Sequence, residues 1–110
     1  MVDERTLAFE LAGELDLSNA PALTDGLSTA LDVAMSGDPS PARMVLDLQN
    51  LTFIDSAGIE ALLATKRRCA ESGAGFALRL GSSRIRRTLT VVGITDLLEI
   101  GGEIQTARLG

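Results

Sequence analysis

The stretch FIDSAGIEALLATKRRCAESG, residues 53–73, contains a junction between a strand pattern and a helix pattern. An apolar, strand-like run ends at Ile54, and an amphipathic helical spacing is established by Ile59. The four residues between them, Asp-Ser-Ala-Gly at 55–58, combine an acid, a hydroxyl and a glycine. In α/β folds, functional groups gather where a strand passes into the following helix. The segment therefore predicts an α/β fold and the position of its site.

The same alternation of strand and helix extends along the chain on both sides of this junction. Period-two or apolar runs predict strands at residues 6–15, 43–48, 76–80 and 95–100. Apolar spacings of three and four predict a helix from a cap at Ser18 or Asn19 to Gly37, with Pro21 in its first turn. A second helix is predicted from the 55–58 junction to Gly73, and its apolar stripe consists of Ile59, Leu62, Leu63 and Ala70. Lys66 falls inside this stripe, so we expect its stem to be buried and its amine to reach solvent. A third helix is predicted from Ser82 or Ser83 to Gly93, with inward residues Ile85, Leu89 and Val92 and outward residues Arg84, Arg86 and Arg87.

Chains that alternate in this way build parallel sheets covered by helices. We therefore predict one α/β domain over residues 1–110, with a mainly parallel four-stranded sheet built from successive βα units and helices packed on it. Its core spans about residues 5–100, and residues 101–110 form a weakly ordered tail. The carboxyl ends of the strands then place residues 14–18, 55–58 and 81–83 along one edge.

The composition fits one small globular domain with an aliphatic core. The 110 residues are 45% apolar but include three Phe and no Trp or Tyr, and the net charge is only −5. A single cysteine, Cys69, excludes an internal disulfide; it borders the apolar stripe of the second helix and is predicted to be structural. The acidic N-terminus does not resemble a signal peptide, and no apolar run reaches 18 residues. We expect a cytoplasmic protein without a membrane partner.

Charge is distributed unevenly along the chain. Residues 1–55 hold ten acidic and two basic side chains, whereas residues 56–110 hold five acidic and eight basic ones. This asymmetry indicates either an acidic partner-binding end or solvated helix faces. Basic residues are not interleaved with aromatic ones, so we do not expect direct binding of nucleic acid.

The residues available for catalysis are few. The chain has no His, which excludes a Ser-His pair, and Lys66 lies ten residues after Ser56, about 15 Å along a helix. No glycine-rich phosphate loop is present. Glu14, Asp16 and Asp55 could together hold Mg²⁺, as in a phosphate-accepting receiver domain, but Lys66 is not at the end of a strand as such a domain requires. We predict no catalytic residue, no bound metal and no cofactor.

Ser56 then has two interpretations that its neighbours leave open. Either Ser56 or Asp55 caps the helix, or Ser56 is modified by another protein, since a phosphate at a helix N-terminus meets free amides and a favourable dipole. Gly58 has a packing interpretation as well, because glycine permits a close approach of helix and strand.

Three segments carry a resemblance to a known family. GELD at residues 13–16 with SNAPAL after it, VLDLQNLTFIDSAGIEALL, and SSRIRRTLTVVGITDLLEI together resemble a STAS domain, and more narrowly the bacterial anti-sigma factor antagonists. The likeness runs from about residue 5 to 100, and FIDSAG is its most specific part. Many relatives have an additional N-terminal strand that pairs with the first strand here, for which this chain leaves only about five residues.

The resemblance implies a partner switch. In the family, the unmodified antagonist binds an anti-sigma factor that is also a serine kinase and thereby frees the sigma factor. The kinase phosphorylates the antagonist, which then dissociates, and a serine phosphatase resets it. ATP and Mg²⁺ belong to the kinase, and we expect the free domain to be monomeric. The implied phosphoacceptor is Ser56, and the implied partner-binding residues are Asp16, Ser18, Asp55, Ser56, Ala57 and Gly58.

Two other functions remain open from the sequence. One is a STAS subunit of another assembly, such as the cytoplasmic partner of a lipid-transporting ABC permease, which needs no phosphoserine. The other is a nucleotide-binding or hydrolysing enzyme, against which the missing catalytic groups argue.

Overall fold

Strands and helices alternate along the chain as predicted. The computed structural model describes residues 5–80 and 83–91. The elements are β1 (Thr6–Leu15), α1 (Ala20–Met35), β2 (Arg43–Ile54), α2 (Ser56–Glu71), β3 (Gly75–Arg79) and α3 (Ser83–Val91).

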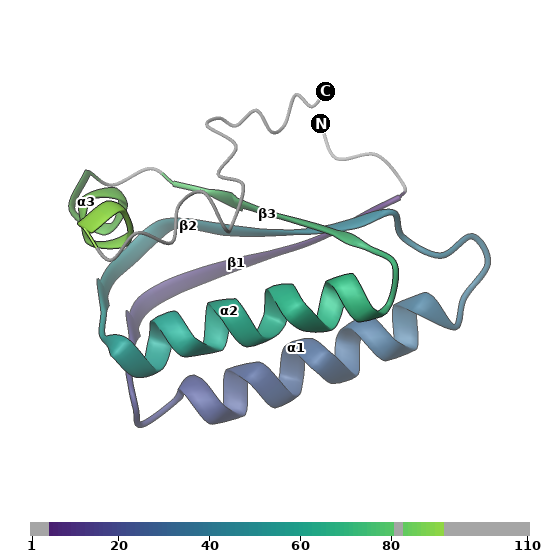
Figure 1. The fold of residues 1–110 in the computed structure, drawn as a ribbon, viewed down its shortest axis with the longest axis horizontal. Helices are drawn as coiled ribbons and strands as arrows, with labels where there is room; N and C mark the ends of the chain where they lie inside the picture. Colours follow the sequence, from purple (N-terminus) through teal and green to yellow (C-terminus); the bar gives the residue numbers. More distant parts are fainter. Residues whose placement is uncertain (1–4, 81–82, 92–110) are drawn as a thin grey trace.

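The strands form one sheet in the order β1-β2-β3, and both neighbouring pairs are parallel. Helices α1 and α2 lie side by side on one face, whereas α3 lies on the other side, at the end where β2 stops (Figure 1). The parallel α/β architecture is confirmed. The predicted number of four strands is not confirmed. The described residues form three strands, and the expected fourth strand at 95–100 and the expected tail lie outside them.

The core is aliphatic. Alternate residues of β2 (Met44, Leu46 and Leu48) are fully buried, and the register places Met44 beside Phe76 and Leu46 beside Leu78 of β3.

Strand β2 is longer than predicted. It continues through the polar pair at residues 49–50 and stays paired with β1, although the register of this ladder shifts between Glu10 and Ala12 and again between Gly13 and Glu14. These shifts are irregularities of the pairing that period-two spacing does not reveal.

The buried face of α2 differs from the predicted one. Leu62 is buried as expected, but Ile59 and Leu63 are only half-buried and Ala70 is exposed. The helix instead turns small and polar residues inward: Gly58, Ala61, Thr65 and Cys69. Thr65 can face the core because its Oγ1 donates to the carbonyl of Ala61, at 2.8 Å.

Two single-residue predictions about α2 concern Cys69 and Lys66. Cys69 is fully buried, as expected of a structural cysteine. Burial raises the pKa of its thiol, against the smaller opposing influence of Arg68 and Lys66. Lys66 is half-buried, in agreement with a partly covered stem.

The ends of α1 agree with the predicted signals. Asn19 occupies the N-cap position, although its side chain makes no capping hydrogen bond, and Pro21 lies in the first turn, while the helix ends one residue before Ser36. In α3, Ile85 and Leu89 are buried and Arg84, with the two arginines at 86–87, is exposed, as the spacing predicted; Val92 lies outside the described residues.

Candidate functional site

The ends of β1 and β2 bring two loops into contact. The backbone N–H of Asp55 donates to the carbonyl of Leu15 at 3.2 Å, and the backbone N–H of Leu17 donates to Asp55 Oδ2 at 3.3 Å. The predicted meeting of residues 14–18 with residues 55–58 is therefore confirmed. Residues 81–82, expected at the same edge, lie outside the described residues.

Asp55 is the N-cap of α2. Its backbone is extended, and its Oδ1 accepts a hydrogen bond from the backbone N–H of Gly58 at 3.0 Å. Because Oδ2 accepts from Leu17, one carboxylate fixes both the start of α2 and the loop after β1. The open choice between Asp55 and Ser56 as the capping residue is thereby settled in favour of Asp55.

Ser56 is the first residue of α2, and its side chain is exposed. Within residues 5–80 and 83–91, no hydrogen bond engages its hydroxyl. The serine therefore contributes no side-chain bond to this part of the fold. Its oxygen is accessible to a protein that approaches the end of the sheet.

Gly58 has a steric role. It is buried, and a Cβ built on it would lie 2.7 Å from Ile54 Cγ1, 2.8 Å from the carbonyl oxygen of Leu15 and 2.9 Å from Leu15 Cγ. Real Cβ atoms essentially never approach other atoms so closely. Glycine at this position lets the first turn of α2 rest directly on the ends of β1 and β2, which supports its packing interpretation. Its expected contribution to partner binding stays a prediction.

Asp16 organises the turn between β1 and α1. Its Oδ1 accepts from the backbone N–H of Ser18 at 2.9 Å and from Ser18 Oγ at 2.6 Å. Its own N–H donates to Asn19 Oδ1 at 2.9 Å, and Asn19 Nδ2 donates to the carbonyl of Glu14 at 2.8 Å. The turn is therefore held by its own side chains, and Asp16 is half-buried within it.

This arrangement displays one residue that the sequence analysis did not select. Leu17 is 72% exposed at the tip of the turn, between Asp16 and Ser18. Its backbone is tied to Asp55, so its side chain points from a fixed loop rather than from a free one. The sequence signal for this residue was a leucine within a turn that is otherwise polar. Ala57, the neighbour of Ser56, is half-buried and packs against the core.

The acids of the site do not form a metal centre. Among the residues that the structure describes, no three His, Cys, Asp or Glu side chains gather as metal ligands. Asp16 and Asp55 use their carboxylates to hold the turn and the helix cap. The Mg²⁺ arrangement that the sequence left open for Glu14, Asp16 and Asp55 is therefore not found. In the described part of the chain, every helix is too short or too polar to cross a membrane.

The family model for the STAS domain matches residues 2–107, and the chain belongs to that family. The sequence is 25% identical over 101 residues to the anti-sigma-B factor antagonist of Bacillus subtilis (strain 168). That match covers 92% of this chain and 86% of the relative.

Two solved structures share the fold. An anti-sigma factor antagonist from Mycobacterium paratuberculosis superposes with a TM-score of 0.79 at 20% identity, covering 99% of this chain and 87% of that chain. A sulfate transporter family protein from Wolinella succinogenes superposes with a TM-score of 0.71 at 23% identity, covering 89% and 75%. At these identities the two structures establish the fold alone.

Proposed function

We propose that this protein is an anti-sigma factor antagonist that works by binding and not by catalysis. In its unmodified form it binds an anti-sigma factor that is also a serine kinase, and the sigma factor is released. Phosphorylation of Ser56 ends that binding, and a serine phosphatase restores it. The sequence relative named as an anti-sigma-B factor antagonist supports this class of function.

The observation that carries the proposal is that Asp55 and Ser56 have different roles at the start of α2. Asp55 caps α2, and Ser56 is exposed, with no hydrogen bond from its hydroxyl to the described residues. A phosphate on Ser56 would lie at the N-terminus of a 16-residue helix, where backbone amides and the helix dipole favour an anion. Modification at this point is therefore compatible with the fold.

The same phosphate would act strongly on a docked partner. It adds a charge of about −1.5 to −2 beside Asp55 and near the turn that contains Asp16. Enclosing that charge without a basic counterpart costs several kcal/mol. A cost of even about 3 kcal/mol weakens binding more than a hundredfold, since about 1.4 kcal/mol corresponds to a factor of ten.

A second candidate is a STAS subunit of another assembly, including the permease partner considered from the sequence. The likeness of the fold to a sulfate transporter family protein favours keeping it. This function needs no modification of Ser56. The two candidates therefore differ in whether phosphorylation occurs and whether it changes binding.

The test is to incubate the protein with its cognate anti-sigma factor kinase and ATP and to map the modified residue by mass spectrometry. We expect one phosphate, on Ser56, and none on the Ser56→Ala variant. Ser56→Ala should still bind the anti-sigma factor and should keep binding after ATP is added. Phosphate on another residue, or no stable complex with the unmodified protein, would contradict the proposal.

A further inference from the structure

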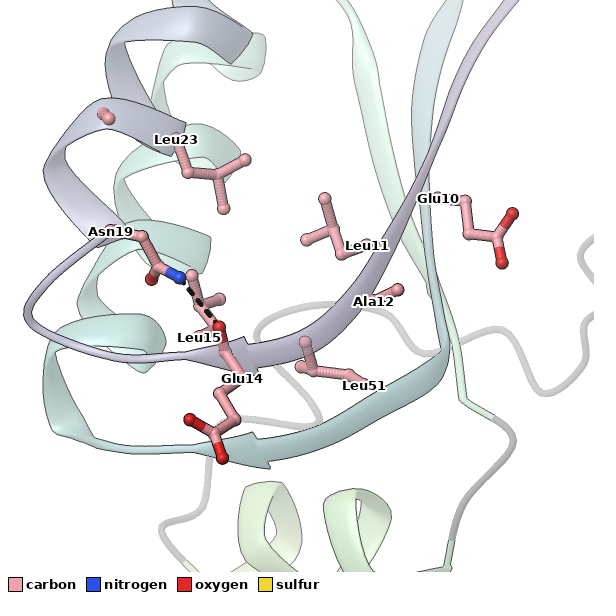
Figure 2. A pocket seen from close by; sticks show the side chains of 9 residues that line it. Glu10, Leu11, Ala12, Glu14, Leu15, Asn19, Leu23 and Leu51 are labelled. Atoms are coloured by element: carbon pink, nitrogen blue, oxygen red, sulfur yellow. Dashed lines mark hydrogen bonds between the residues drawn. The ribbon is translucent and has the colours of Figure 1, made fainter.

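A hollow lies beside the site, between the second half of β1 and the start of α1. Its volume is about 390 Å³. Leu11 of β1 and Leu23 of α1 point toward each other across it, and Leu51 of β2 contributes to its floor (Figure 2). Leu11 and Leu23 are only half-buried, so this part of the apolar core is reachable from outside.

The hollow opens at the edge of the sheet. Among the described strands, β1 pairs with β2 only, and none of them covers its other edge. The residues that line the hollow include two acids, Glu10 and Glu14, and no base. Glu10 accepts a hydrogen bond from Asn50, whereas no hydrogen bond within the described residues engages the exposed carboxylate of Glu14. The exposed carboxylate of Glu14 points away from Leu11 and Leu23 in Figure 2, so it offers a pairing site for a basic group beside the hollow rather than inside it.

The lining of the hollow is connected by hydrogen bonds to the turn after β1 and to the cap of α2. Asn19 lines it and donates to the carbonyl of Glu14, as the dashed line in Figure 2 marks. Asn19 also accepts from the backbone of Asp16, and the next residue, Leu17, is bound to Asp55. A short chain of hydrogen bonds thus links the hollow to the cap of α2.

We propose that the hollow is a second docking point for the anti-sigma factor, and that it receives an apolar side chain of that partner next to a lysine or arginine that pairs with Glu14. This inference rests on the proposed function and adds to it the chemistry of the partner. The apolar contact supplies affinity, because burying such a side chain removes hydrocarbon surface from water. The basic group supplies orientation and a dependence on salt.

Two substitutions test the hollow, each with a matched control. Ala22 is an exposed alanine of α1 that lines the hollow, and Ala22→Trp would fill it. Ala70 is an exposed alanine near the end of α2, and Ala70→Trp introduces the same side chain elsewhere. Glu14→Lys reverses the charge at the rim, and Glu71→Lys makes the same change at the last residue of α2.

The measurement is calorimetric titration of the purified anti-sigma factor with each full-length variant, after thermal melts have shown that the variants fold. We expect Ala22→Trp to bind at least tenfold more weakly than wild type and Ala70→Trp to bind as wild type does. Glu14→Lys should bind several-fold more weakly than Glu71→Lys, with a smaller dependence on salt. If Ala22→Trp does not fold, Ala22→Leu, which fills less of the hollow, takes its place in the comparison, with Ala70→Leu as its control.

The outcomes separate this inference from the proposed function. If folded Ala22→Trp binds with wild-type affinity, the hollow is not a docking point, but the proposed function as an anti-sigma factor antagonist is unaffected. Equal affinities of Glu14→Lys and Glu71→Lys would show that no basic group of the partner pairs with Glu14. Wild-type protein that does not bind the anti-sigma factor overturns the proposed function, and this inference with it.

Discussion

Replacing Gly58 by alanine should destabilise the protein, although alanine is the better helix former. The added Cβ would lie 2.7–2.9 Å from three atoms of Ile54 and Leu15. One of these atoms is the backbone carbonyl oxygen of Leu15, which cannot rotate away as a side chain can. Overpacking a closed site typically costs about 1–3 kcal/mol. Moving α2 outward instead would stretch the bond from the Gly58 N–H to Asp55, and loss of an N-cap costs about 1 kcal/mol.

The higher helix propensity of alanine offsets at most about 1 kcal/mol of this cost. Three contacts below 3.0 Å, one of them to a backbone oxygen, place the overpacking cost near the upper end of its range. After the offset we expect Gly58→Ala to lose about 2 kcal/mol of unfolding free energy, which lowers Tm by about 8–15 °C in a domain of this size. The matched control is Gly26→Ala in α1, where the added Cβ meets no atom within 4 Å. That change should stabilise by about 0.5–1 kcal/mol.

Both variants can be compared with wild type by urea unfolding followed by circular dichroism. Opposite signs for the same substitution are the expected result. A Gly58→Ala protein as stable as wild type would show that α2 does not approach β1 and β2 as closely as described.

Three further changes test the site and the core. Asp55→Ala removes both hydrogen bonds of the carboxylate and should cost about 2 kcal/mol, with faster hydrogen exchange at Leu17 and Gly58; unchanged exchange would contradict the cap. Asp16→Ala removes the two hydrogen bonds that its carboxylate accepts from Ser18 and should cost about 1 kcal/mol of stability, and the folded protein should bind the kinase about 10–100-fold more weakly. Unchanged binding by the folded fraction would leave Asp16 a turn residue only. Cys69 should react slowly with thiol reagents until the protein unfolds. Because burial raises its pKa above 9.0, stability should fall as the pH rises past that value, and Cys69→Ala should reduce that decline.

Much of the fold was predictable because its signals are local. The polar residues before Ala20 and the proline at 21 mark the start of α1, and the strand at 43–48 alternates with period two. The buried face of α2 was predicted less well, because Thr65 faces inward only by bonding to its own helix. Hydropathy counts Thr65 as polar and Ala70 as apolar, and it does not register a hydrogen bond four residues away.

The site was predictable in position but not in its internal roles. The carboxyl ends of neighbouring parallel strands, and the loops that follow them, lie at one edge of the sheet. Residues 14–18 and 55–58 were therefore correctly placed together. Which of Asp55 and Ser56 caps α2 depends on backbone angles and on a contact with Leu17, 38 residues away from Asp55. The sequence shows neither. The exposure of Leu17 likewise follows from a turn that Asp16, Ser18 and Asn19 bond together in three dimensions.

Phosphate on Ser56 should control the binding of the anti-sigma factor. The decisive experiment is to titrate one preparation of that partner with unmodified protein and with protein stoichiometrically phosphorylated on Ser56, both shown by circular dichroism to be folded. We expect the phosphorylated form to bind more than a hundredfold more weakly, while its melting temperature stays near that of the unmodified form. Equal affinities of the two folded forms would contradict this expectation.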